Sequence, residues 1–173
     1  MNYVVGRVRL RQVRGFGGSC PVNNVFSKFL LCYEPYKSEV EERRPYGIQK
    51  SFKWLPAEQT GSLAFIGSDA TMYPGSGYVV DLPSGRNDSL AILQFLNHQG
   101  WIDEETRLVL AQVPIYLANR NVWCVVTLAS VFRFSGNVDV ISQYQVTFYI
   151  IYECSRLRIY SVFSSISIYR RIF

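Results

Sequence analysis

The feature that most constrains the fold is a pair of strand-forming runs, Thr106 to Tyr116 and Val122 to Phe134, separated by only five residues. Val recurs in both runs, and β-branched residues favour strands. The connecting sequence LANRN contains two asparagines, which tolerate the positive φ of a tight turn better than most residues. A turn this short predicts that the two runs pair as an antiparallel β-hairpin.

Three further segments are typical of strands. Between Val4 and Val13, apolar residues alternate with Arg7, Arg9 and Arg11. This period of two predicts a half-buried strand with its basic face in water. The other two segments are Gly77 to Leu82 and Gln145 to Tyr152.

One segment, Ser84 to Gly100, has the pattern of an amphipathic helix. Asn87 or Asp88 is expected to be the N-cap, where a side-chain oxygen accepts a hydrogen bond from an unpaired backbone amide. Gly100 fits the left-handed position that follows the last turn of many helices. The expected apolar face, with the three- to four-residue spacing of a helix, consists of Ile92, Leu93 and Leu96.

The size and charge of the chain favour a single folded domain. Its 173 residues are 49% hydrophobic, which allows a core, and the formal net charge is +5. A basic surface can bind nucleic acid or anionic glycans, but an excess this small favours a solvated surface. The strip of Arg7, Arg9, Arg11 and Arg14 lacks the interleaved exposed aromatics of an RNA-binding sheet. We interpret it as a solvated strand face or a contact between subunits.

The sequence does not favour an enzyme. His98 is the only histidine, so a zinc site with two histidines is excluded. The consecutive acids Asp103 to Glu105 can in principle do acid–base work, but we interpret them as a solvated cap. Gly75-x-Gly77 lacks the third glycine of a dinucleotide fingerprint and precedes a strand, so its glycines are expected to let the backbone turn. With no G-x-S-x-G motif, a hydrolase is the least favoured reading, and no cofactor or metal is expected.

The cysteines and one sequon leave alternatives open. By spacing alone, Cys20 and Cys32 are either a disulfide or two unrelated thiols. Cys124 lies in an apolar run and is expected to be a buried thiol, although pairing with Cys154 stays open. Asn87 begins the only Asn-x-Ser/Thr sequon, which is a glycan acceptor if the chain faces the lumen and otherwise only the helix cap.

Several blocks occur together in a familiar order. They are LRQVR followed by Ser-Cys, then GSGYVVDL, a helix, GWIDEETR and IYLANRNVWCVVTL. Over about residues 4 to 135, this series resembles the extracytoplasmic domain of the polycystin cation channels, which lies between the first two transmembrane helices. The segments FLNHQGWID and CVVTL resemble the polycystin-1-like members more than the compact channel-type members.

The resemblance implies an α+β fold, in which an antiparallel sheet carries helices on one face and projects long loops. We expect residues 1–140 to form this domain and residues 141–173 to hold a last strand and a divergent tail. The resemblance also implies a Cys20–Cys32 disulfide, a glycan on Asn87, and core anchors at Trp101 and Trp123. The candidate subunit contacts are Leu117, Asn119, Arg120 and Asn121.

The implied function is a luminal or extracellular assembly and gating domain of a polycystin-1-like, calcium-permeable cation channel subunit. Its partners would be other polycystin subunits in a homo- or heterotetramer, with no nucleic acid, and its parent protein would lie in the plasma membrane, cilium or endoplasmic reticulum. The sequence shows no signal peptide and no apolar run of about 20 residues, so we expect a fragment without the pore. The alternative is a soluble, basic, β-rich module that binds nucleic acid or an anionic glycan.

Overall fold

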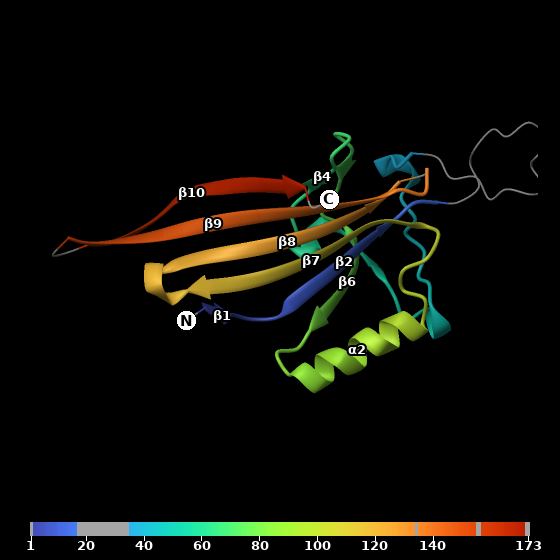
Figure 1. Cartoon of the computed structure of the whole chain (residues 1–173), viewed down its shortest axis with the longest axis horizontal. Helices are drawn as coiled ribbons and strands as arrows, with labels where there is room; N and C mark the ends of the chain where they lie inside the picture. Colours follow the sequence, from blue (N-terminus) through green and yellow to red (C-terminus); the bar gives the residue numbers. More distant parts are fainter. Residues whose placement is uncertain (1, 17–34, 134, 155–156, 172–173) are drawn as a thin grey trace, which may run out of the picture.

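The computed structural model describes residues 2–16, 35–133, 135–154 and 157–171, and its main feature is an eight-stranded antiparallel sheet (Figure 1). The strand order is β10-β9-β8-β7-β2-β6-β3, and β1 also pairs with β7. The strands are β1 Asn2–Val4, β2 Val8–Arg14, β3 Trp54–Leu55, β6 Gly77–Leu82, β7 Thr106–Leu117, β8 Val122–Phe132, β9 Val138–Cys154 and β10 Leu157–Arg171.

Smaller elements surround this sheet. A two-stranded sheet consists of β4 Phe65–Ile66 and β5 Met72–Tyr73. The helices are α1 Ala57–Thr60, α2 Arg86–His98, and the 3-10 turns η1 Ser38–Val40, η2 Ile48–Lys50 and η3 Ala118–Arg120. Figure 1 shows α2 along one side of the large sheet and β4 on the opposite side. The expected α+β class and the helix on one face are confirmed.

The β7–β8 hairpin forms as the sequence predicts. Its register runs without a break from Leu108 opposite Val131 to Leu117 opposite Val122. Asn121 ends the turn in the left-handed region, with φ of 49°. β9 starts earlier than the expected strand at Gln145, and it runs on through residue 140, where the domain boundary was expected.

β7 continues through Pro114, although proline cannot donate a ladder hydrogen bond. The carbonyl of Pro114 accepts from the Val5 amide, so its nitrogen also faces the β1–β2 side of β7. On that side the pairing is interrupted between β1 and β2, near Gly6, which has φ of 91°. The missing donor therefore falls at a gap in the ladder, and the pairing with β8 is kept.

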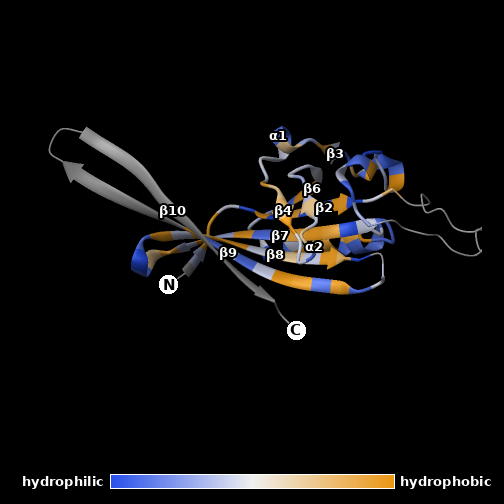
Figure 2. Ribbon diagram, turned by 90° about the horizontal axis from the view of Figure 1, so that it is seen from above, coloured by the Kyte–Doolittle hydropathy of each residue, from blue (hydrophilic) through white to orange (hydrophobic). Residues whose placement is uncertain are grey.

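The period of two along β2 and β7 sends side chains to two separate cores. On one face, Leu108 and Leu110 join a cluster that includes Phe65 and Tyr73 of the small sheet. On the other face, Val109 packs against a cluster formed by Phe52, Tyr78, Leu96 and Trp101. Hydrophobic and hydrophilic residues alternate along the ribbons of the sheet (Figure 2). Both faces are covered in this part of the sheet, because α2 lies over one and the small sheet over the other.

α2 corrects the expected start of the helix and confirms its end. The N-cap is Gly85 and makes no side-chain cap bond, so Asn87 and Asp88 lie inside the first turn. At the other end, Gly100 is left-handed with φ of 62°. The Gly100 amide donates to the Asn97 carbonyl at 3.2 Å and the Trp101 amide to the Leu96 carbonyl at 3.0 Å. This Schellman motif carries Trp101 from the helix end into the core.

The two glycines of Gly75-x-Gly77 allow close backbone contacts. A Cβ on Gly75 would lie 2.0 Å from the Ser62 carbonyl oxygen. A Cβ on Gly77, which has φ of 139°, would lie 2.3 Å from the Gln12 carbonyl oxygen. The two glycines therefore allow β6 and the residues before it to pack closely against Ser62 and Gln12, whereas the sequence had predicted only a backbone turn there.

We expect Gly77→Ala to lower the free energy of unfolding by about 2 to 4 kcal/mol, because it adds a backbone clash to a disfavoured φ. Gly61→Ala is the matched control, since Gly61 has φ of 61° but open space around its Cβ position. The control should cost only about 1 kcal/mol for the left-handed conformation. Urea unfolding of both variants tests this, and equal losses would show that the close contact contributes nothing.

Candidate subunit-contact surface

The exposed end of the β7–β8 hairpin contains all four residues expected to contact another subunit. Leu117 is half-buried, whereas Asn119, Arg120 and Asn121 are exposed. The hydroxyl of Tyr116 donates to the Asn121 side-chain oxygen at 2.8 Å and so fixes the turn. The hairpin end extends beyond α2 and β4 (Figure 1).

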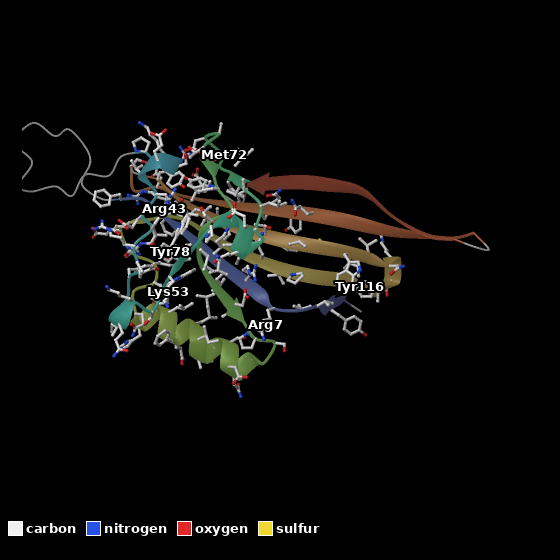
Figure 3. All side chains as sticks on the ribbon, turned by 180° about the vertical axis from the view of Figure 1, so that it is seen from behind. Arg7, Arg43, Lys53, Met72, Tyr78 and Tyr116 are labelled. Atoms are coloured by element: carbon white, nitrogen blue, oxygen red, sulfur yellow. The ribbon has the colours of Figure 1, made fainter. Side chains whose placement is uncertain are left out.

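Three aromatic residues form a row beside this turn. Tyr3 of β1 lies opposite Tyr116 of β7, which lies opposite Trp123 of β8. The Tyr116 and Trp123 rings are 5.1 Å apart between centroids. Tyr3 is 51% exposed and Trp123 is 37% exposed. Figure 3 shows Tyr116 at the end of the molecule remote from Tyr78.

The position of Trp123 corrects the expectation that it anchors the core. Its side chain is on the sheet face that the small sheet covers elsewhere, but the hairpin end lies beyond that cover. Trp101, in contrast, is only 3% exposed and is a member of a core cluster, as expected. No pattern in the sequence had singled out Tyr3 or Tyr116. The hairpin register alone places Tyr116 opposite Trp123, so that pair was open to prediction.

A row of tyrosine and tryptophan next to an arginine has the composition of a protein-binding hot spot. We therefore define the contact surface as Tyr3, Tyr116, Trp123 and the turn Leu117 to Asn121. Its aromatic rings are rigid and partly exposed, and its strands continue into the covered part of the sheet. This arrangement can present a fixed surface to another protein.

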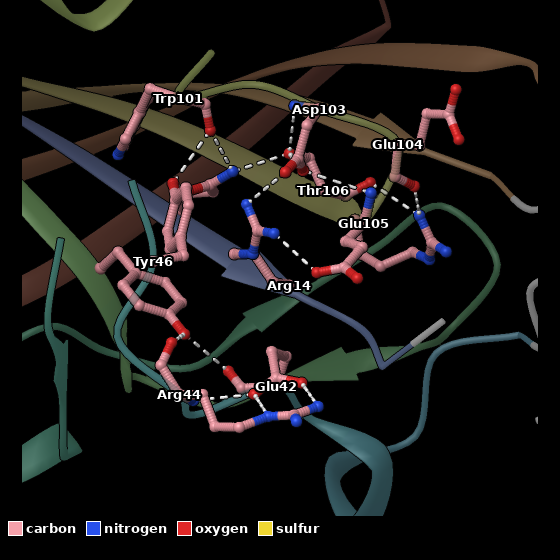
Figure 4. Close-up of polar contacts among 12 residues, drawn as sticks. Arg14, Glu42, Arg44, Tyr46, Trp101, Asp103, Glu104, Glu105 and Thr106 are labelled. Atoms are coloured by element: carbon pink, nitrogen blue, oxygen red, sulfur yellow. Dashed lines mark hydrogen bonds and ion pairs between the residues drawn. The ribbon is translucent and has the colours of Figure 1, made fainter. Parts of the chain in front are cut away.

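A buried ionic cluster supports the fold at the opposite end of β7. The Arg14 guanidinium is 2.7 Å from an Asp103 carboxylate oxygen and 2.6 Å from one of Glu105 (Figure 4). It also lies 3.6 Å from the centroid of the Tyr46 ring. Burial lowers the pKa of Arg14, but the hydrogen bond to Glu105 and the charge of Asp103 outweigh it and raise the pKa.

The same cluster joins neutral groups. The Gln12 amide donates to the Trp101 carbonyl and to the Thr106 hydroxyl, both at 2.6 Å. The single O–H of Tyr46 is shared between two acceptors, the Trp101 carbonyl oxygen at 3.0 Å and the Gln12 side-chain oxygen. Burial raises the pKa of the Tyr46 hydroxyl well above its usual value. These bonds tie β2 to the loop after α2 and to the segment around Tyr46.

The arginine strip corrects the expectation of a basic face in water. Arg11 is fully buried, and its guanidinium donates to the carbonyl oxygens of Ser76 at 3.0 Å and Leu63 at 3.2 Å. Burial lowers the pKa of Arg11 to about 10. Arg9 is half-buried and pairs with Asp81 at 2.7 Å. The strip fails as a solvated face because the long polar side chains reach backbone carbonyls of the loops that cover the sheet.

The acidic turn is exposed at Asp103 and Glu104, as expected of a solvated cap, but its carboxylates also bind the buried Arg14. Asp103 and Glu105 hold Arg14, and the Glu104 carbonyl accepts from Arg107 at 2.8 Å. Glu41 is buried as well, and its carboxylate accepts from the Ser76 hydroxyl and the Trp54 indole, both at 3.0 Å. The carboxylates of Asp103, Glu105 and Glu41 hold together segments that are distant in the sequence, so we assign them a role in the fold and not in catalysis.

The structure also places the candidate glycan acceptor and one of the cysteines. Asn87 is exposed on the first turn of α2. Cys124 is a buried free thiol, and burial raises its pKa. Cys20 and Cys32 lie outside the described residues. Over the described part of the chain, no group of three or more His, Cys, Asp or Glu residues is placed to hold a metal, and no helix is long and apolar enough to cross a bilayer.

Comparison with known proteins gives consistent matches. Residues 1–149 match the family model described as the Polycystin domain. The chain is 34% identical to human polycystin-2-like protein 1 over 138 residues, which is 78% of this chain and 17% of that protein. It is 32% identical to polycystin-2 of Danio rerio over 147 residues, which is 83% of this chain and 16% of that protein. The chain therefore spans less than a fifth of the length of these relatives.

The comparisons correct the expected subtype. Mouse polycystin-1-like protein 3 is 31% identical over 144 residues, a match that covers 73% of this chain. The two polycystin-2-type relatives match with higher identity and over more of the chain. The segments FLNHQGWID and CVVTL were too short to decide between the two types.

We expect Arg14→Met to lower the free energy of unfolding by about 1 to 2 kcal/mol, because it removes the cation from two carboxylates that solvent partly screens and loses the contact with the Tyr46 ring. Arg7→Met is the matched control, since Arg7 is exposed on the strip that leads to the same strand. The control should stay within about 0.5 kcal/mol of the unchanged protein. Equal stability of the two variants in urea unfolding would contradict a supporting role for Arg14.

Two depressed carboxyl pKa values predict acid sensitivity. The hydrogen bond from Arg9 lowers the pKa of Asp81, and that from Arg44 lowers the pKa of Glu42. A group whose pKa is lower in the folded state stabilises the fold above its unfolded pKa of about 4. Unfolding free energy should therefore fall as the pH drops below about 4.

In Asp81→Asn, the free energy of unfolding should fall less steeply as the pH drops below about 4. In the control Asp88→Asn, which changes an exposed residue, it should fall as steeply as in the unchanged protein. At pH 7 the Asp81 change should cost about 0.5 to 1 kcal/mol, since both partners are partly exposed and solvent screens the pair. Urea unfolding at several pH values from 7 to 3 measures both effects. An identical pH slope in the two variants would refute the assignment.

Proposed function

Because this chain belongs to the polycystin family, we propose that it is an extracytoplasmic assembly and gating domain of a polycystin cation channel subunit. The observation that carries this proposal is the contact surface, whose aromatic residues are partly exposed. It lies at the hairpin end, past α2 on one face of the sheet and past β4 on the other. The role is binding, without catalysis. The pore would belong to other parts of a longer membrane protein, in keeping with the share of its relatives that this chain spans.

The proposed partners are other polycystin subunits. Trp123 and Tyr3 supply partly exposed aromatic area, and Arg120 supplies a fixed charge beside them. Aromatic residues and arginine dominate the binding energy of many protein interfaces. The ionic cluster around Arg14 holds the other end of β7, so a force on the hairpin acts on a sheet anchored between two cores. That anchoring supports a role in gating.

A nucleic-acid or anionic-glycan module is not favoured. Such a module needs free cations along the arginine strip, and Arg9, Arg11 and Arg14 make the internal contacts described above. Arg7 is the exposed member of that strip. We also keep as a proposal the division of the chain into a domain of residues 1–140 and a second part, residues 141–173, that holds a last strand and a divergent tail; β9 crosses this boundary.

We propose that the domain faces the lumen or the cell exterior. Asn87 is then the glycan acceptor, and its exposure on α2 supports this role. Cys20 and Cys32 are then the disulfide that the family resemblance implies, formed in an oxidising compartment. Peptide mapping of the secreted chain without reductant tests the pair, and two alkylated thiols at Cys20 and Cys32 would refute it.

We expect Arg120→Glu to weaken binding to a co-expressed polycystin-2-like subunit. Lys53→Glu is the matched control, because it makes the same charge change at an exposed position remote from the hairpin end (Figure 3). Trp123→Ala tests the aromatic part of the surface and should weaken binding about thirtyfold, as a hot-spot residue does. Co-purification measures all three, and equal recovery of the variants and the control would exclude this surface.

We expect the chain, when fused to a secretory signal, to carry one N-linked glycan. Treatment with an N-glycanase should increase its electrophoretic mobility, and Asn87→Gln should remove that shift. Asn97→Gln is a suitable control, because Asn97 is exposed on the same helix outside any sequon. A shift that persists in the Asn87 variant would contradict the site, and no shift in the unchanged secreted chain would contradict the luminal position.

A further inference from the structure

A short loop holds an isoleucine in solvent on a fixed base. Tyr46 and Phe52 close the loop with two backbone hydrogen bonds, both 3.1 Å long. Phe52 is buried in a core cluster, and Tyr46 packs against the same cluster. Ile48, in contrast, is 64% exposed. We call the exposed part of this loop, residues 47–51, the tip.

The backbone of the tip is strained. Gln49 and Lys50 both have φ of 57°, although a left-handed conformation is unfavourable for residues that carry a Cβ. Both side chains are exposed, so packing in the core does not offset this cost. Strain held at an exposed position is a feature of many functional surfaces. It also fixes the direction in which Ile48 is presented.

The charge around the tip has one sign. Residues 43–57 contain four cations and no acid, and the cations are Arg43, Arg44, Lys50 and Lys53. Lys50, two residues after Ile48, is exposed and forms no ion pair with any part of the chain that the structure describes. A surface that fits the tip therefore combines an apolar depression with carboxylates.

The chain itself carries such a surface. A cavity of about 270 Å³ opens between α2 and the sheet, with an almost wholly apolar lining. It is larger than the roughly 150 Å³ of a cavity that holds benzene, so it can take an isoleucine side chain. Leu93 and Ile102 line it and are 42% and 53% exposed. Asp103 and Glu104 follow Ile102 directly, and both are exposed.

The tip does not fill the cavity of its own chain. At the base of the loop, the Phe52 ring packs against Phe95 of α2, with 6.5 Å between the ring centroids. The cavity is lined instead by Leu93, and residues two apart in a helix point to different sides. The loop and the cavity therefore lie on different sides of α2, and the cavity is open to a second molecule.

We infer that two copies of this chain bind each other, with the Ile48 tip of one copy in the cavity of the other. The apolar side chain enters the cavity, and Lys50 comes close to Asp103 and Glu104 beside it. Tip and cavity are different surfaces, so the contact either forms twice about a two-fold axis or continues head to tail. The inference does not rest on the proposed hairpin contact, which uses neither surface.

The first test is sedimentation velocity of the full chain at protein concentrations up to about 1 mM. We expect the sedimentation coefficient to rise with concentration, and Ile48→Ser to weaken this self-association at least about tenfold. Leu63→Ser is the matched control, because it makes a similar change at a residue before β4 that is 71% exposed. A constant sedimentation coefficient, or equal losses in the two variants, would overturn the inference.

A second pair of variants tests the cavity. Leu93→Arg places a long cationic side chain at the opening, where it obstructs the tip and repels Lys50 of the second copy. Leu90→Arg makes the same change one turn earlier on α2, at an exposed position outside the lining. Self-association should weaken at least about tenfold in the Leu93 variant and stay unchanged in the Leu90 variant. Equal effects in both would exclude the cavity.

Mixing two of these variants tests whether tip and cavity are partners. Ile48→Ser keeps the cavity intact and Leu93→Arg keeps the tip intact, so a mixture can form one complete contact. We expect fluorophore-labelled Leu93→Arg chain to sediment faster when excess Ile48→Ser chain is added. Excess unlabelled Leu93→Arg chain should have no such effect. A labelled chain that responds to neither, or to both equally, would overturn the inference.

Two further measurements separate this contact from other modes of self-association. Trp123→Ala removes an aromatic residue of the hairpin surface and should leave self-association unchanged. Loss of self-association in this variant, with retention in Ile48→Ser, would assign it to the hairpin and overturn the inference. Added salt should weaken the contact, because salt screens the attraction between Lys50 and the acidic residues. An association that strengthens with salt would contradict that pairing.

Discussion

The buried guanidinium of Arg14 is the interaction on which the two halves of the molecule depend. It joins β2 to the loop before β7 through Asp103 and Glu105, and it joins both to the segment around Tyr46. These parts are far apart in the sequence, and the same segments also share the apolar cluster around Trp101 and Tyr78. A buried cation requires charged partners, because an unpaired charge in a protein interior is far more costly than a lost apolar contact. This requirement fixes the relative positions of the segments more specifically than apolar packing does.

In the β7–β8 hairpin, a sheet face is buried where other elements pack on it and exposed where they do not. β7 and β8 are long, and both cores cover only one end of them. At the covered end, Leu108 and Val131 are buried in a core. At the other end, Tyr116 and Trp123 lie on the same sheet face as Leu108 and Val131, and Trp123 reaches solvent. The next pair, Leu117 and Val122, lies on the opposite face. The same strand pair thus provides a core at one end and partly exposed aromatic residues at the other, where we propose the subunit contact.

The sequence predicted the local elements well and the environment of its charges poorly. The β7–β8 hairpin, β6, and the helix that ends at Gly100 follow from patterns within about thirty residues. The arginines of β2 were assigned to water because their alternation is the pattern of a half-exposed strand. Their true partners are Ser76, Asp81 and Glu105, which are at least sixty residues away along the chain. No local pattern contains that information.

The sequence by itself determined the family, the α+β class and the pairing of two strands across the tight turn. These depend on ordered motifs, on periodicity and on turn chemistry, all of which are properties of neighbouring residues. Only the tertiary structure decided that Arg11 and Arg14 are buried, that Trp123 is exposed and that Trp101 lines a cavity. Burial depends on which distant segments cover a given face, and that is settled when the chain packs.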